Sequence, residues 1–126
     1  MTPAGFSSRC IIVLALAGAA LSAPPAAART NYDGNWSVLI VTESGPCDRA
    51  YRYGISIRNG AVVYEGSAPV TLGGQVANNG AVRVRVSAGS QSASGAGRLS
   101  RNSGGGTWSG SGSSGTCSGT WSAERR

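Results

Sequence analysis

Hydrophobic and polar residues alternate along two stretches of the chain, as they do in β-strands that have one buried face. Tyrosine and isoleucine take every second position over 49–58, and valine alternates with arginine over 81–88. Each stretch runs into a hairpin signal, because Asn59-Gly60 suits a type I′ turn and Gly89-Ser90 suits a type II′ turn. The pattern therefore predicts two antiparallel hairpins, each with an apolar face.

The two turns also fix which residues face each other across the paired strands. The expected pairs are Ile57–Val62, Ile55–Tyr64, Val86–Ala93, Val84–Gly95 and Val82–Gly97. In the first hairpin apolar residues meet apolar residues. In the second hairpin each large residue meets a small one, which is how the interior of a narrow barrel is filled.

Turn signals recur about every ten residues from Gly34 onward, a spacing typical of an all-β sandwich or barrel. No stretch after residue 28 has sustained helical periodicity. The expected strands are 35–43, 49–58, a short one from Ala61, 70–77, 81–88, 91–100, 105–110 and 116–124. Turns are expected between them, including 44–46, 78–80, 102–104 and 111–115.

The three tryptophans all stand in a Gly-x-Trp-Ser setting: Trp36 near the start of the predicted domain, Trp108 and Trp121 at its end. Packing them together brings the two ends of the chain close, as when the last strand of a barrel pairs with the first. We therefore expect an all-β fold, a small eight-stranded antiparallel up-and-down β-barrel. A two-sheet β-sandwich is the alternative.

Closure of the barrel makes a prediction about the cysteines. If the last strand pairs with the first, Cys117 at the start of the last strand lies near Cys47, which follows the first strand. Two cysteines in an exported chain are typical of one disulfide, and the chain has no histidine to complete a metal site. A Cys47–Cys117 disulfide is therefore expected, and no metal site.

The N-terminal segment, 1–28, has the features of a secretory signal peptide. Arg9 precedes an apolar run over 10–23, and Ala26-Ala27-Ala28 offers a small-residue cleavage pattern. The run is short for a membrane span and is closed by prolines, so a retained anchor is the less favoured interpretation.

Cleavage is expected after Ala28, with Ala23 as an alternative, and either removes Cys10. A polar leader (29–33) and a single barrel domain (34–126) then remain. The expected localisation is periplasmic or secreted, with no transmembrane segment after cleavage of the signal.

The composition lacks the residue types on which many enzyme mechanisms depend. The chain has no histidine and no lysine, so the commonest general base and the amine nucleophile are both missing. Its carboxylates are few and scattered, and its serines have no base partner. We expect a non-enzymatic protein with no catalytic residues and no cofactor.

The net charge of +6 comes from arginine, and four arginines form a candidate binding surface. Arg83 and Arg85 lie on one face of a strand, Arg98 falls on the same outward side of the paired strand, and Arg101 follows nearby. This basic stripe could meet a polyanion or anionic lipid, or it could be a solvated barrel exterior. No aromatic residue interleaves with it, so specific nucleic-acid binding is not expected.

The aromatic residues are the other candidates for binding. Trp36, Trp108 and Trp121 could form a stacking platform or a partner anchor, or they could be barrel core. Tyr51, Tyr53 and Tyr64 could line a ligand cavity or supply a phenolate to haem, or they could be core residues with hydroxyls at the rim.

Several runs of the sequence resemble a group of small exported proteins of rhizobia-related alphaproteobacteria. The runs are Tyr32-Asp33-Gly34-Asn35-Trp36-Ser37, Cys47-Asp48-Arg49-Ala50-Tyr51-Arg52-Tyr53, Asn79-Gly80-Ala81-Val82, Ser92-Ala93-Ser94-Gly95 and 117–126. Members are loosely labelled as exoproteins of haem utilisation or adhesion, which implies haem acquisition or surface attachment. In architecture alone the predicted domain is similar to periplasmic barrel inhibitors of metalloproteases and lysozymes.

Three hypotheses of function follow. The first is an exported barrel that engages a macromolecular partner, an unknown protein or an envelope polymer, as an inhibitor-like or envelope-associated module. The second is a carrier of a small ligand or haem with an open barrel mouth. The third is an adhesion or structural protein that uses the basic face. A filled interior disfavours the carrier, and a tryptophan exposed near the rim favours partner binding.

Overall fold

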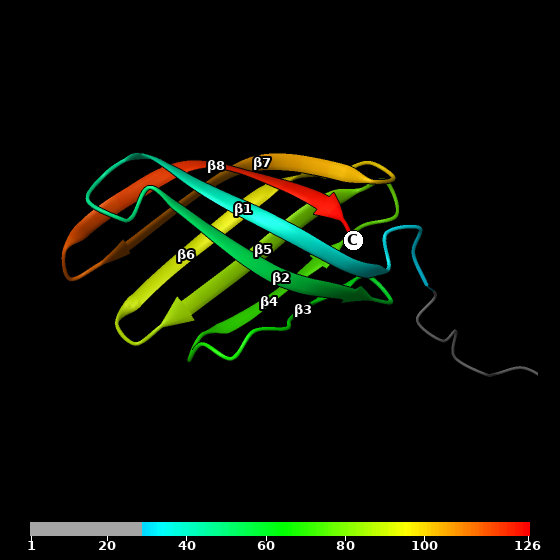
Figure 1. Cartoon of the computed structure of the whole chain (residues 1–126), viewed down its shortest axis with the longest axis horizontal. Helices are drawn as coiled ribbons and strands as arrows, with labels where there is room; N and C mark the ends of the chain where they lie inside the picture. The colour runs from blue at the N-terminus through cyan, green and yellow to red at the C-terminus, as the bar shows by residue number, and fades with distance from the viewer. Residues whose placement is uncertain (1–28) are drawn as a thin grey trace, which may run out of the picture.

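The computed structural model describes residues 29–126, and the predicted signal peptide, 1–28, lies outside them. The described chain forms a closed barrel in which eight antiparallel strands pair in chain order (Figure 1). The strands are β1 (Gly34–Ser44), β2 (Ala50–Arg58), β3 (Ala61–Tyr64), β4 (Thr71–Val76), β5 (Ala81–Ala88), β6 (Gln91–Leu99), β7 (Ser103–Gly112) and β8 (Gly115–Arg125). The predicted eight-stranded barrel is confirmed, and the alternative of a sandwich is excluded.

The registers predicted from turn chemistry are confirmed in both hairpins. The observed pairs include Ile57–Val62, Ile55–Tyr64, Val86–Ala93, Val84–Gly95 and Val82–Gly97. The φ angles of Asn59 and Gly60 are 51° and 82°, the positive values that a type I′ turn needs at both central positions.

Strand β7 is longer than predicted, because the sequence indicated a strand over 105–110 and a turn over 102–104. The turn lies earlier, where the Ser100 N–H donates to the Ser103 carbonyl at 2.7 Å. Ser103 already pairs with Glu124 on β8. Pairing with a full-length neighbour in the closed barrel overrides the turn preference of serine and glycine here.

The ends of the chain meet as predicted, since β1 pairs with β8 along most of its length. The disulfide between Cys47 and Cys117 joins residues 70 apart in sequence, with their Cα atoms 6.2 Å apart. In the chain-entropy model, a crosslink that closes a loop of this length stabilises the fold by about 4 kcal/mol. The predicted disulfide is therefore a large part of the stability of so small a barrel.

One end of the barrel is filled by side chains and covered by the leader. The buried core cluster consists of Trp36, Ile57, Val62, Val76, Val82, Leu99, Trp121 and Ala123. Over this cluster, the Trp36 indole donates to the Tyr32 carbonyl at 2.8 Å. The Asp33 carboxylate accepts the backbone N–H groups of Asn59 at 2.6 Å and Gly60 at 3.2 Å. We call this the plugged end.

Arg125 fastens the cover of the plugged end. Its guanidinium lies 4.7 Å from the ring centroid of Trp36. It donates to the carbonyls of Asn31 at 2.7 Å, Asp33 at 2.8 Å and Arg101 at 3.0 Å. The leader, 29–33, is thus part of the barrel's closure rather than a loose polar tail.

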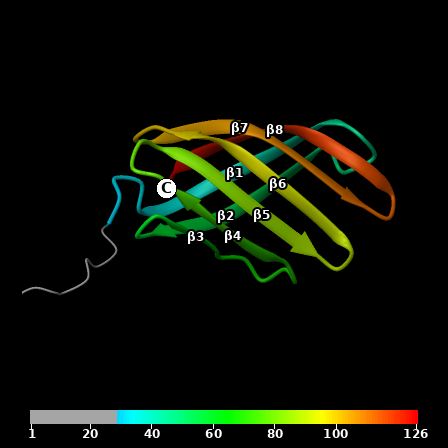
Figure 2. The same cartoon turned by 180° about the vertical axis from the view of Figure 1, so that it is seen from behind.

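The opposite end is less complete, because β3 has four residues and β2 has nine. The last backbone hydrogen bond on that side of β2 runs from the Glu65 N–H to the Gly54 carbonyl at 3.1 Å, so residues 50–53 pair only with β1. Between β3 and β4 the ladder has the single pair Ala61–Gln75. Figures 1 and 2 show β2 and β4 diverging here. We call this the open end. We call the region between residues 50–53 and β4, where no strand ladder forms, the seam.

Candidate functional site

The interior of the open end is a cavity of about 280 Å³. Its floor is the core cluster of the plugged end, and side chains that point into the barrel form its wall. Wall residues that the sequence analysis did not name as binding candidates are Val38, Ile40, Leu72, Val84, Val86 and Ala93. These apolar side chains are only half-buried, although they face the interior. The volume is just below the range of about 300–1,000 Å³ that is typical of small-molecule sites.

The cavity exists because three interior positions at the open end, two on β6 and one on β7, carry only alanine or glycine. Ala93 faces Val86 on one side and Gly110 on the other, and Gly95 faces Val84. At the plugged end the same interior is filled by Leu99 and Trp121. Along β6 the interior residues change from Leu99 at the plugged end to Gly95 and Ala93 at the open end. The pairing of large with small residues, which the sequence predicted to fill the interior, therefore leaves space at the open end.

Trp36 and Trp121 form the floor of the cavity, with exposed fractions of 0% and 7%. The Trp121 indole lies over Gly106 and Gly97, where an added Cβ would collide with it. Its N–H donates to the Ala96 carbonyl at 3.2 Å. These two tryptophans are core residues and do not form an exposed platform.

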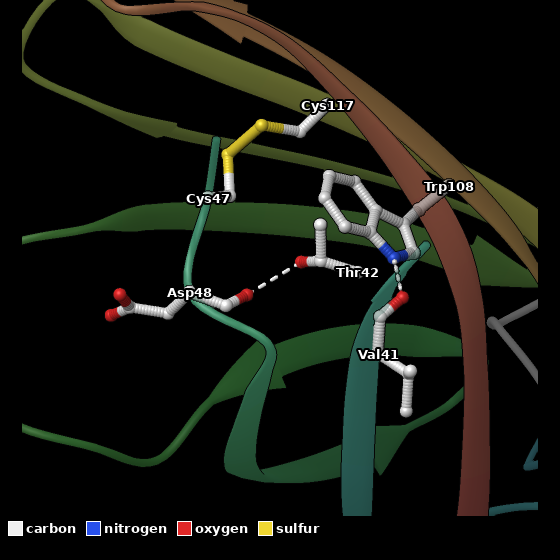
Figure 3. Close-up of a disulfide and its surroundings, with 6 residues drawn as sticks. All are labelled: Val41, Thr42, Cys47, Asp48, Trp108 and Cys117. Carbon is white, nitrogen blue, oxygen red and sulfur yellow. Dashed lines mark hydrogen bonds between the residues drawn. A yellow bond between two sulfur atoms is a disulfide. The ribbon is translucent and has the colours of Figure 1, made fainter. Parts of the chain in front are cut away.

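Trp108 is half-buried and belongs to the wall of the cavity. Its indole N–H donates to the Val41 carbonyl on β1 at 3.0 Å (Figure 3). It faces Gly119 on β8, and an added Cβ at Gly119 would collide with that same carbonyl. Together with the bonds of Trp36 and Trp121, this contact means that all three indole N–H groups bind backbone carbonyls.

The disulfide holds the rim of the cavity on the side of the β1–β2 loop. Cys47 and Cys117 both line the cavity. Beside them, the Thr42 hydroxyl donates to the Asp48 carbonyl at 2.6 Å (Figure 3), and the Thr42 N–H donates to the Arg49 carbonyl at 2.9 Å. The loop is therefore fixed by a covalent bond and two hydrogen bonds.

The three candidate tyrosines form one cluster next to the seam. Tyr51 and Tyr53 stack with centroids 6.2 Å apart, and Tyr53 meets Tyr64 edge-on at 6.0 Å. Tyr51 and Tyr53 line the cavity, and Tyr51 is 36% exposed. The Tyr64 hydroxyl instead accepts the Ala68 N–H at 3.4 Å, outside the cavity lining.

The surroundings of Tyr53 favour its neutral phenol. Burial raises the pKa of Tyr53 above its ordinary value, and the neighbouring Tyr51 and Tyr64 raise this pKa further. A neutral phenol can donate a hydrogen bond, whereas ligation of haem iron requires the phenolate. The geometry therefore fits a hydrogen-bonding role for Tyr53 better than the haem-ligand role considered from the sequence.

The four stripe arginines lie outside the cavity. Arg83 and Arg85 project outward from β5, and Arg98 from β6 donates to the Asn79 carbonyl at 3.2 Å. Arg101 is exposed in the β6–β7 turn. The predicted common face of Arg83, Arg85 and Arg98 is present, but none of these arginines is brought to the cavity.

The lining of the cavity is uncharged: among residues 29–126, no arginine, aspartate or glutamate contributes to it. Its polar members are hydroxyl and amide side chains at the rim. Besides Tyr51 and Tyr53, they are Ser87, Gln91, Ser92, Ser94, Ser111 and Ser114. The site thus combines an apolar interior with a neutral hydrogen-bonding rim.

Comparisons of this chain with models of protein families, with curated proteins and with solved structures find no match. Within 29–126 there is no helix long and apolar enough to cross a membrane. The same residues contain no group of three or more histidine, cysteine, aspartate or glutamate side chains arranged to hold a metal ion.

Proposed function

We propose that this chain is a non-enzymatic binding protein that holds a small apolar ligand in the open end of its barrel. The observation that carries the proposal is the uncharged cavity of about 280 Å³ next to a fully packed plugged end. Burial of apolar surface drives such binding, because transfer of apolar groups out of water is favourable. This is the second of the three functional hypotheses, without its haem version.

The affinity expected for such a site is modest. A ligand of about ten non-hydrogen atoms, contributing roughly 0.6 kcal/mol each, binds with a dissociation constant of roughly 40 μM. The rigid barrel supports binding, since the wall residues stand on paired strands and the rim is crosslinked.

Export to the periplasm or the medium, after removal of 1–28, is part of the proposal and agrees with a disulfide-bonded chain. Membership of the rhizobial group of exported proteins stays a prediction. So do the macromolecular partner and the role of the basic stripe.

The test is a titration of purified 29–126 with N-phenyl-1-naphthylamine, an uncharged dye whose fluorescence rises in apolar surroundings. We expect saturable binding of about one dye per chain. The blocking variant Val84→Phe adds a ring to the wall and should weaken binding at least tenfold. The control is Arg83→Ala on the outer face of the same strand, which should leave binding unchanged.

Absence of saturable dye binding by a folded wild-type protein would overturn the proposal. Equal binding by Val84→Phe and wild type would do the same, because the dye would then bind elsewhere. The thermal unfolding midpoint of each variant, measured by circular dichroism, shows that a loss of binding is not a loss of fold.

A further inference from the structure

We infer that the ligand of this cavity is an uncharged amphiphile, with an apolar tail inside the barrel and a hydrogen-bonding head group at the hydroxyls of Tyr51 and Tyr53. The inference rests on the proposed function and names the ligand class of the same site. It follows from how polar groups are distributed between the floor, the wall and the rim.

The floor and the inner wall offer a ligand no free hydrogen-bond donor from a tryptophan. Each of the three indole N–H groups is bound to a backbone carbonyl. The other inner side chains are those of valine, isoleucine, leucine and alanine. A polar group placed there would lose its hydrogen bonds to water without replacement, which costs about 1–3 kcal/mol. The inner part therefore selects an apolar tail.

The rim offers hydrogen bonds instead. Within 29–126 the hydroxyls of Tyr51 and Tyr53 have no hydrogen-bond partner, whereas that of Tyr64 accepts the Ala68 N–H and lies outside the cavity lining. Tyr51 and Tyr53 stand on alternate positions of β2, so both point to the interior side of the seam. They place two phenol hydroxyls where the head group of a bound amphiphile would lie.

The head group must be uncharged because nothing in the lining can neutralise a charge. Transfer of an ionised group from water to a partly buried site without a partner is unfavourable. The charged residues of the nearby β1–β2 loop, Glu43, Asp48 and Arg49, are exposed and do not line the cavity. A carboxylate or an ammonium would therefore bind more weakly than an alcohol with the same tail.

The size of the cavity limits the tail. A volume of about 280 Å³ corresponds to about nine water-sized groups, or a chain of roughly eight to ten carbons. The head of such a chain would lie near the seam, because Tyr51 and Tyr53 on β2 and Leu72 on β4 line the cavity where no ladder joins the two strands.

The test is displacement of N-phenyl-1-naphthylamine from 29–126 by three ten-carbon competitors: decanol, decanoate and decylammonium. The measurements are made in 0.15 M salt, because salt screens the attraction between the basic exterior and decanoate. We expect decanol to displace the dye at a concentration at least tenfold lower than either ion. Equal or stronger displacement by decanoate or decylammonium would overturn the inference while the proposed function stands.

The role of the tyrosines is tested by the double variant Tyr51→Phe/Tyr53→Phe. Decanol should bind fivefold to tenfold more weakly to it, and the dye should lose less affinity than decanol does. The control is Tyr32→Phe, which removes a phenol hydroxyl at the plugged end and should change neither value. Unchanged decanol binding by the double variant would show that the hydroxyls of Tyr51 and Tyr53 do not bind the head group. Failure of the dye to bind at all would instead refute the proposed function.

Discussion

The plugged and open ends of the barrel are built from the same strands but are stabilised in different ways. On β5, Val82 is buried in the core cluster, whereas Val84 and Val86 on the same face are half-buried on the cavity wall. At the plugged end, two tryptophans and a covering leader fill the space. At the open end, a disulfide and two loop hydrogen bonds hold a rim around empty volume.

This difference indicates a division of labour within one small domain. The packed core supplies the hydrophobic stabilisation that folding requires. The open end gives up part of that stabilisation, and its half-buried apolar wall remains available to another molecule. The disulfide compensates because it acts on the unfolded chain and needs no core at its own position.

The largest expected effect comes from removing that compensation. The double variant Cys47→Ser/Cys117→Ser should lose about 4 kcal/mol of unfolding free energy, measured by denaturant titration. A loss below about 1 kcal/mol would show that the open end is stable without its crosslink. The comparison between the two ends would then need another explanation.

The stability of the plugged end should be sensitive to added side chains at the glycines that contact the Trp121 indole, Gly97 and Gly106. Gly106→Ala places a methyl group against the Trp121 indole and the Ala96 carbonyl, and overpacking of this kind costs about 1–3 kcal/mol. The matched control is Gly73→Ala, where an added Cβ has no neighbour within 4 Å. Thermal unfolding of both variants should show a clear loss only for Gly106→Ala, and equal values would contradict the packing described for Trp121.

Two consecutive arginines have different roles: Arg125 holds the leader over the plugged end, whereas Arg126 forms an ion pair on the surface. Arg125→Ala removes the guanidinium from Trp36 together with its bonds to three carbonyls, and should cost about 2 kcal/mol. Arg126→Ala removes an ion pair to Glu65 at 3.1 Å between largely exposed groups and should cost less than about 1 kcal/mol. Denaturant titration measures the loss of unfolding free energy in each variant. A larger loss for Arg126→Ala than for Arg125→Ala would show that Arg125 does not hold the plugged end closed.

The smallest effect concerns pH and Asp33. Burial raises the pKa of this carboxyl, but hydrogen bonds from Thr30, Asn59 and Gly60 lower it by more, so the net pKa lies below its ordinary value. Its contribution to stability is therefore present above the ordinary pKa and is lost as pH falls through the lowered folded value.

The check is the thermal midpoint of wild type and Asp33→Asn between pH 7 and pH 2. The wild type should be the more stable protein at pH 7, and the difference should shrink below about pH 4. A difference that is constant with pH would mean that the charge of Asp33 does not hold the leader.

Much of the fold was predictable because it depends on local chemistry and on alternation. The Asn59-Gly60 turn determines the β2–β3 register, and the placement of Cys47 and Cys117 follows from closure. Each of these inferences needs only neighbours in sequence or directly paired strands.

The cavity and the covering of the plugged end by the leader could not be predicted in the same way. The leader covers the barrel because Asp33 reaches Asn59, 26 residues away, and nothing in 29–33 alone indicates that contact. The seam depends on β3 ending at Tyr64, which a run of β-forming residues does not fix. Which tyrosine hydroxyls stay free also depends on the loop after β3, where Ala68 occupies only that of Tyr64.

The most direct test of a ligand site at one end is a methyl NMR titration of 29–126 with decanol. The valines of β5 are matched reporters, because Val82 lies at the plugged end while Val84 and Val86 line the cavity wall. We predict saturable shifts and ligand contacts at Val84 and Val86, and little change at Val82 or at the exposed Val63. Contacts confined to Val63 and other outer positions, or no saturable shift at all, would contradict the central claim that the open end is a binding site.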